Sequence, residues 1–146
     1  MKAILVRGFG GPEVLRVEDC ADFRPELGTA LNKVLVAVKA VGVNPVDAYI
    51  RAGIYPRKPE LPYIPGTDAA GVVEAVTEDV KTFKPGDRVY VYAAAHAYAE
   101  SIFVDASRVF PLPSALSFDQ GAALGVPYGT AHRGGSRSAR RDAGAL

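Results

Sequence analysis

Polar side chains that could do chemistry are concentrated in one short stretch of the chain, at Asn44, Asp47, Tyr49 and Tyr55. An amide and a phenol can donate hydrogen bonds to an oxygen atom on which negative charge develops. On a helix, Asp47 and Tyr49 point in different directions and cannot act as one pair, whereas Asn44 and Tyr49 could still reach one cleft. The other interpretation of both tyrosines is packing at the edge of a core.

The chain has few residues that could bind a metal ion or a phosphate group or act as a nucleophile. The chain has one cysteine, Cys20, and two histidines, His96 and His132, without the spacing of a metal site. Asp47 and Asp68 alone would make a poor zinc site. The glycines around Gly10 lack the Lys-Ser/Thr that completes a phosphate-binding loop. We therefore expect no metal and no nucleophilic triad.

The elements around this stretch are predicted to be short strands separated by turns. Strand candidates occur at 3–6, 14–18, 33–41, 69–76, 88–92, 98–104 and 108–110. Asn44 and Pro45 suit the start of a helix over 46–52 that ends before Gly53. Ser117 and Gln120 suit a capping box. The pattern indicates a mainly β domain with short helices, as a small barrel or sandwich.

Composition limits the class of protein. Of 146 residues, 49% are hydrophobic and 23% are charged, as in ordinary globular domains. No apolar run is long enough for a membrane span. The apolar run near the N-terminus is also too short to be the core of a signal peptide. Together with the single cysteine, this favours a cytoplasmic protein.

The last fourteen residues differ from the rest. Residues 133–146 hold four arginines and one Asp, which leaves 13 basic and 15 acidic residues in 1–132. With little to bury, this segment is predicted to be a disordered tail outside the domain 1–132.

Four motifs and a helix resemble one known family. The motifs are Gly10–Leu15, Gly42–Asp47, Pro65–Gly71 and Lys84–Val89, and the helix is Gly121–Ala131. In this order they resemble the zeta-crystallin and NADPH quinone oxidoreductase branch of the medium-chain dehydrogenases/reductases. The resemblance covers 1–132 and implies a GroES-like, partly open β-barrel followed by a linking helix.

The resemblance also implies roles for individual residues. Zinc-binding members have Cys at the position of Asn44 and His at that of Thr67, so it implies a zinc-independent protein. It places Tyr49 and Asn44 as catalytic residues beside the nicotinamide of NADPH and Tyr55 against the quinone. The residues alone favour packing at a core edge for both tyrosines; the resemblance reverses this for Tyr49 and leaves the two interpretations of Tyr55 even.

The expected function follows from these roles. The chain is predicted to be a truncated NADPH-dependent quinone oxidoreductase that is inactive alone, because the family's Rossmann domain would follow residue 132. The alternative is a non-catalytic interaction module, crystallin-like or RNA-binding, and homo-oligomers are possible in either case. The mildly acidic body argues against RNA, and only the arginine-rich tail favours it.

Overall fold

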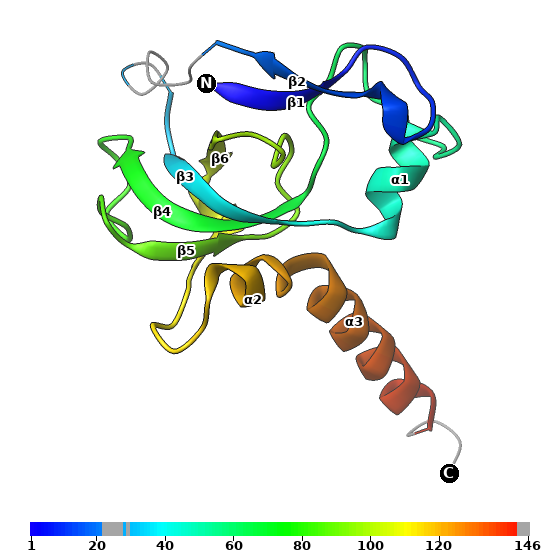
Figure 1. Ribbon diagram of the computed structural model, residues 1–146. Coiled ribbons are helices and arrows are strands. Elements are labelled where there is room, and N and C mark those ends of the chain that lie inside the picture. The colour runs from blue at the N-terminus through cyan, green and yellow to red at the C-terminus, as the bar shows by residue number, and fades with distance from the viewer. Residues whose placement is uncertain (22–27, 29, 143–146) are drawn as a thin grey trace.

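The structure is a computed structural model that describes residues 1–21, 28 and 30–142, with backbone only beyond Arg133. Two antiparallel sheets account for all the strands in this part of the chain (Figure 1). The larger sheet has the strand order β6-β3-β4-β5-β7, and β1 and β2 form a separate pair. The prediction of a mainly β fold is confirmed.

The larger sheet is built around β3 (Lys33–Gly42), which pairs with β4 (Asp68–Val76) along its length. The remaining strands are β5 (Arg88–Val91), β6 (Ser101–Asp105) and β7 (Val109–Pro111). On its other side β3 pairs with β6 only over Lys33–Ala37. The stretch Lys39–Gly42 therefore has one strand partner among the described residues.

Valine and isoleucine side chains explain why these segments form strands and a core. Val34, Val36, Val73, Val89 and Ile102 are at most 1% exposed and pack in one cluster. Branched side chains suit the pleated surface of a sheet, and their removal from water is the main force that closes it. The first half of β3 is buried on both faces, which suits its continuous run of apolar residues.

The backbones of β3 and β4 approach each other closely at one point of their pairing. A side chain at Gly71 would collide with the backbone carbonyl of Ala37, so only glycine fits there without a shift. The glycine in this motif is thus explained by packing.

The smaller sheet pairs β1 (Lys2–Val6) with β2 (Leu15–Asp19), and the 3-10 turn η1 (Pro12–Val14) precedes β2. The strand predicted over 98–104 begins later, at Ser101. Tyr98 accepts a hydrogen bond from the Ile4 amide, and the Glu100 amide donates to Lys2. Residues 98–100 are thus held mainly by β1, and Glu100 also accepts a hydrogen bond from the Val38 amide of β3, where the pairing with the larger sheet begins.

Two short helices match their predicted caps. Helix α1 is Pro45–Arg51, and α2 is Phe118–Ala122, which the Ser117 and Gln120 capping box begins. A 3-10 turn, η3 (Ala106–Arg108), links β6 to β7. Helix α2 packs against β3, β4 and β5 and closes one side of the barrel (Figure 1).

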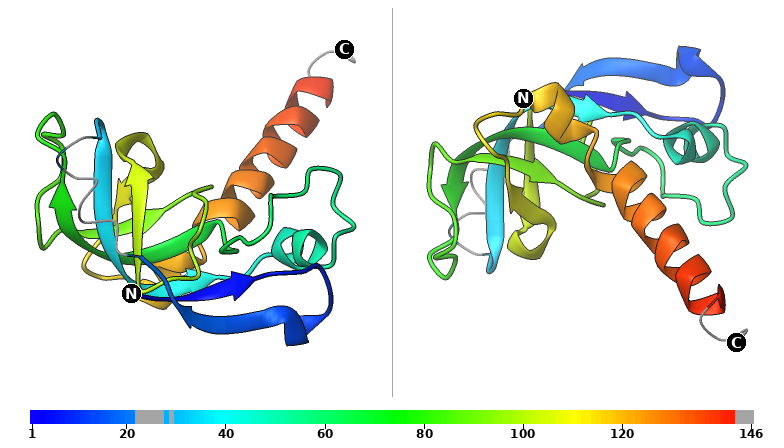
Figure 2. Two further views of the ribbon diagram at one scale, coloured as in Figure 1. Left: turned by 90° about the horizontal axis from the view of Figure 1, so that it is seen from above. Right: turned by 90° about the horizontal axis from the view of Figure 1, so that it is seen from below.

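Helix α3 (Gly125–Asp142) differs from the prediction. It continues past residue 132, where composition predicted a disordered tail, so residues 133–142 are helical; residues 143–146 lie outside the described part. The helix leaves the barrel and projects from it in every view (Figures 1 and 2). A helix forms its backbone hydrogen bonds within its own segment, so a helical backbone does not require a buried face. A domain boundary at residue 133 stays a prediction.

The described helices include none that is both long and apolar enough to cross a membrane.

Candidate functional site

Helix α1 places the polar stretch that the sequence singled out. Asn44 is extended at the N-cap, and its backbone N–H donates to Asp47 Oδ2 at 2.8 Å. Pro45 occupies the first turn, where its missing N–H costs nothing. Gly53, with φ +74°, follows the helix in the left-handed region that ends many helices. The predicted helix is confirmed to within one residue at each end.

Asp68 connects this helix to the start of α3. It is fully buried, and its Oδ2 accepts from the side-chain amide of Asn44 at 3.0 Å and from the backbone N–H of Val126 at 2.8 Å. Its Oδ1 has no hydrogen-bond partner in the described part of the chain. The Asn44 amide is therefore committed to a structural contact.

The side-chain amide of Asn44 makes a second contact, with the hydroxyl of Thr67. The Asn44 nitrogen lies 3.4 Å from Thr67 Oγ1, a long hydrogen bond in which the hydroxyl accepts. The hydroxyl hydrogen of Thr67 is left to donate elsewhere.

Asp47 turns inward, away from Tyr49. It is 6% exposed, and its Oδ2 accepts from the Tyr98 hydroxyl at 3.3 Å. Burial raises the pKa of Asp47, although the hydrogen bonds from Asn44 and Tyr98 oppose that rise. Burial, and then the nearby Asp47 charge, raise the pKa of Tyr98. Tyr98 therefore stays protonated and remains a donor at neutral pH.

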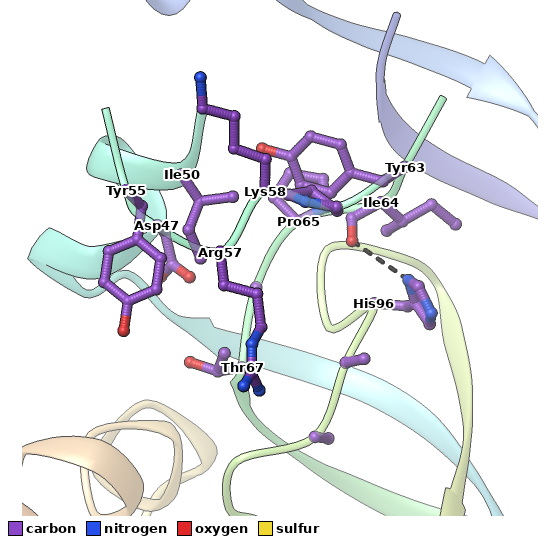
Figure 3. A pocket seen from close by; sticks show the side chains of 14 residues that line it. Asp47, Ile50, Tyr55, Arg57, Lys58, Tyr63, Ile64, Pro65, Thr67 and His96 are labelled. Atoms are coloured by element: carbon purple, nitrogen blue, oxygen red, sulfur yellow. Dashed lines mark hydrogen bonds between the residues drawn. The ribbon is translucent and has the colours of Figure 1, made fainter. Parts of the chain in front are cut away.

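A cavity of about 350 Å³ lies beside α1, between the segment after Tyr55 and the loop around His96 (Figure 3). This volume is at the lower end of the range for small-molecule sites. Most of its wall is apolar, from Ile50, Pro59, Ile64, Pro65, Gly66, Ala94 and Ala95. Its polar lining consists of Asp47, Tyr55, Arg57, Lys58, Tyr63, Thr67 and His96.

Of the three predicted site residues, Tyr55 lines this cavity, and Asn44 and Tyr49 do not. Tyr55 lines the cavity and is 38% exposed. Tyr49, 51% exposed, and Asn44, 5% exposed, are not among the lining residues. The amides of Ile54 and Tyr55 both donate to the Tyr49 carbonyl, so Tyr49 and Tyr55 belong to one tight turn. Their proposed roles stay predictions.

Sequence reasoning did not select Thr67, Arg57 or His96 as lining residues. Thr67 could have been found, because it occupies a metal-ligand position of zinc-binding relatives and such a position faces a site. Arg57 carried no signal, since one arginine in a loop is ordinary surface composition. The His96 ring is held by a contact of its Nδ1 with the Ile64 carbonyl at 3.2 Å (Figure 3).

Asn44 and Thr67 occupy the two positions that ligate zinc in zinc-binding members of the family, and in this chain their side chains contact each other. Within the described residues, no group of three or more His, Cys, Asp or Glu side chains could hold a metal ion. Zinc independence stays a prediction, which elemental analysis of the purified chain would check.

Comparison with known proteins defines the class. Residues 30–114 match the alcohol dehydrogenase GroES-like domain. This match covers more than half of the chain, which therefore belongs to that family, and the predicted GroES-like fold is confirmed.

Individual relatives narrow the class to quinone oxidoreductase homologues. The chain is 49% identical to the quinone oxidoreductase of Mus musculus over 146 residues, which are 99% of this chain and 43% of the mouse protein. It is 44% identical to quinone oxidoreductase 1 of Escherichia coli (strain K12) over 115 residues, 78% of this chain and 34% of that protein. The chain thus spans less than half the length of these relatives.

A solved structure supports the same relationship to quinone oxidoreductases. The Escherichia coli quinone oxidoreductase complexed with NADPH superposes with a TM-score of 0.75 and 42% identity, over 84% of this chain and 36% of that one. The resemblance to quinone oxidoreductases is confirmed.

Proposed function

We propose that the cavity beside α1 is the quinone side of an NADPH-dependent quinone oxidoreductase. The observation that carries the proposal is an apolar cavity edged by the hydroxyl-bearing side chains of Tyr55 and Thr67, in a chain 49% identical to a quinone oxidoreductase. A flat, uncharged ring suits apolar walls, and hydroxyl donors suit its oxygens.

The described residues could contact the nicotinamide end of NADPH, but they form no site for its pyrophosphate. Tyr49 projects from α1 with half its surface exposed, so a nicotinamide ring could lie against it. The pyrophosphate needs a glycine-rich turn between a strand and a helix. In the described part α3 follows α2 instead of a strand, and no such unit is formed. Residues elsewhere in a complete enzyme would have to bind the phosphates.

The chemistry of the reaction comes from the cofactor, since bound NADPH supplies a hydride to the quinone. The residues of this chain would hold the ring, exclude water and stabilise the charge that grows on the quinone oxygen. Thr67 and Tyr55 are the proposed donors to that oxygen. Asn44 then acts indirectly, because its amide is bonded to Asp68 and Thr67 and so orients the Thr67 hydroxyl.

The first test uses the 146-residue chain alone. Without pyrophosphate contacts, a few contacts to the nicotinamide must offset about 4–15 kcal/mol of lost translational and rotational freedom. We expect NADPH to bind more weakly than about 1 mM and no quinone reduction. Calorimetry and an absorbance assay with a benzoquinone would check both. Micromolar NADPH binding would contradict the division of the site proposed here.

The second test supplies a nucleotide-binding part by joining residues 1–132 to the remainder of the Escherichia coli enzyme. We expect quinone reduction to return. In this chimera Tyr55→Phe should lower kcat about tenfold with little change in NADPH affinity, because the hydrogen bond from Tyr55 to the quinone oxygen in the transition state is lost. Tyr128→Phe, at an exposed tyrosine outside the cavity lining, is the control. Equal losses in both variants would refute the assignment of Tyr55.

A further inference from the structure

Arg57 is a cation directed into an otherwise largely apolar cavity. It lies two residues after Tyr55, and its side chain extends across the cavity toward Thr67 in the view of Figure 3. Among the residues that the structure describes, Arg57 has no ion-pair partner. A guanidinium is always charged and presents several donors in a planar fork.

The acid that lines the cavity does not neutralise Arg57. Asp47 is the one carboxylate in the lining, and the Asn44 backbone N–H and the Tyr98 hydroxyl both donate to its Oδ2. Burial also raises the pKa of Asp47, which weakens its tendency to carry charge.

The neighbouring cation is directed elsewhere. Lys58 Nζ lies over the ring of Phe9, 5.7 Å from its centroid, and points away from the cavity in Figure 3. A cation above an aromatic face is already partly stabilised. Arg57 is therefore the cation that a ligand in the cavity would meet.

We propose that the cavity prefers a quinone that carries a fixed anionic substituent, a sulfonate or carboxylate, with Arg57 as the residue that binds the anion. This inference rests on the proposed function, because the cavity must first accept the quinone ring. The apolar walls would hold the ring while the guanidinium donates to two oxygens of the anion, the geometry in which arginine binds such groups best.

The test compares two rings that differ in charge. Anthraquinone-2-sulfonate and the neutral 2-(hydroxymethyl)anthraquinone would be titrated into the 146-residue chain in the same dimethyl sulfoxide buffer, with amide shifts of Gly66 and Ala94 as the readout. Because hydrogen bonds to charged groups are the stronger ones, we expect the sulfonate to bind about tenfold more tightly than the neutral ring. Added salt should reduce this preference.

Variants assign the preference to one residue. Arg57→Gln should abolish the tenfold preference and leave binding of the neutral ring unchanged. Lys58→Gln should retain most of it. Arg16→Gln, an exposed arginine on β2 with the same change in charge, should retain all of it. Inorganic sulfate alone should shift neither amide at the same concentration.

The outcomes separate this inference from the proposed function. Equal binding of the two rings, or equal weakening of both by Arg57→Gln, would overturn the role of Arg57 and leave the quinone site standing. Sulfate binding as tight as that of the sulfonated ring would show an anion site without ring recognition and overturn the inference. Binding of neither ring would overturn the inference and the quinone site together.

Discussion

The five-stranded sheet and the segment between β3 and β4, residues 43–67, are held in place by different forces. In the sheet, side chains such as Val36 and Ile102 are at most 1% exposed and pack in one apolar cluster. In the segment, Val43 and Ile54 are more than 70% exposed, and buried polar contacts to Asp68 and Asp47 add to the packing of Tyr63 and Ile64. Apolar burial provides a stable frame, and directional hydrogen bonds fix the orientation of the site on it.

The largest effect should come from the sheet. Ile102→Ala removes a buried side chain from the main cluster and should cost about 2–5 kcal/mol of unfolding free energy. Urea unfolding followed by circular dichroism would measure it, with Ile102→Val as a milder step should the alanine variant fail to fold. Leu31→Ala, at a position 74% exposed, is the control and should change stability by less than about 0.5 kcal/mol. Similar losses at both positions would show that the sheet is not the main source of stability.

A smaller effect is expected at the junction of the two regions. Asp68→Ala removes the acceptor for the Asn44 amide and the Val126 N–H and should cost about 1–3 kcal/mol. Hydrogen exchange should speed up at the Val126 amide while amides of β5 are little affected. Asp68→Asn keeps one acceptor oxygen and should lose less. Uniform acceleration across the domain would mean that Asp68 supports the whole fold and does not act as a local anchor.

The smallest effect is a difference in pH dependence between the two regions. Burial raises the pKa of Asp47 above its usual value near 3.8, so its contribution to stability is complete below that value and is lost as pH rises through the raised pKa. At the end of β6, hydrogen bonds from Ser107 lower the pKa of Asp105, so its contribution is present above 3.8 and is lost as pH falls through the lowered pKa.

The two aspartates should therefore respond with opposite signs. The stability of the unmodified chain relative to Asp47→Asn should fall as pH rises above about 4, and relative to Asp105→Asn it should fall as pH drops below about 4. Unfolding midpoints measured across this range would show both slopes. Slopes of the same sign would contradict the difference in burial between the two sites.

The sequence predicted most of the sheet because its signals are local. The valine-rich run at 33–41 and the Asn44-Pro45 cap act within a few residues, and both elements occur nearly where expected. The division into two sheets depends on long-range pairing, such as Ala3 with Ala99, which no local pattern encodes.

The site was less predictable for the same reason. Tyr55 was expected to line the quinone pocket and does line the cavity. The commitment of the Asn44 amide to Asp68 and the direction of Arg57 result from contacts between segments that are distant in sequence or lie in a loop. The continuation of α3 past residue 132 was missed because composition reports what can be buried, and a helix that projects from the barrel buries little.

Within the described residues, the stretch Lys39–Gly42 of β3 pairs with a strand on one side only, and this has a consequence for handling the protein. An open strand edge exposes backbone donors and acceptors that can recruit a strand from another molecule, which is the first step of aggregation. Lys39, exposed within this stretch, places a charge on the edge, and such charges discourage strand addition. The solubility of the chain in concentrated solution should therefore depend on that lysine more than on any other single residue of β3.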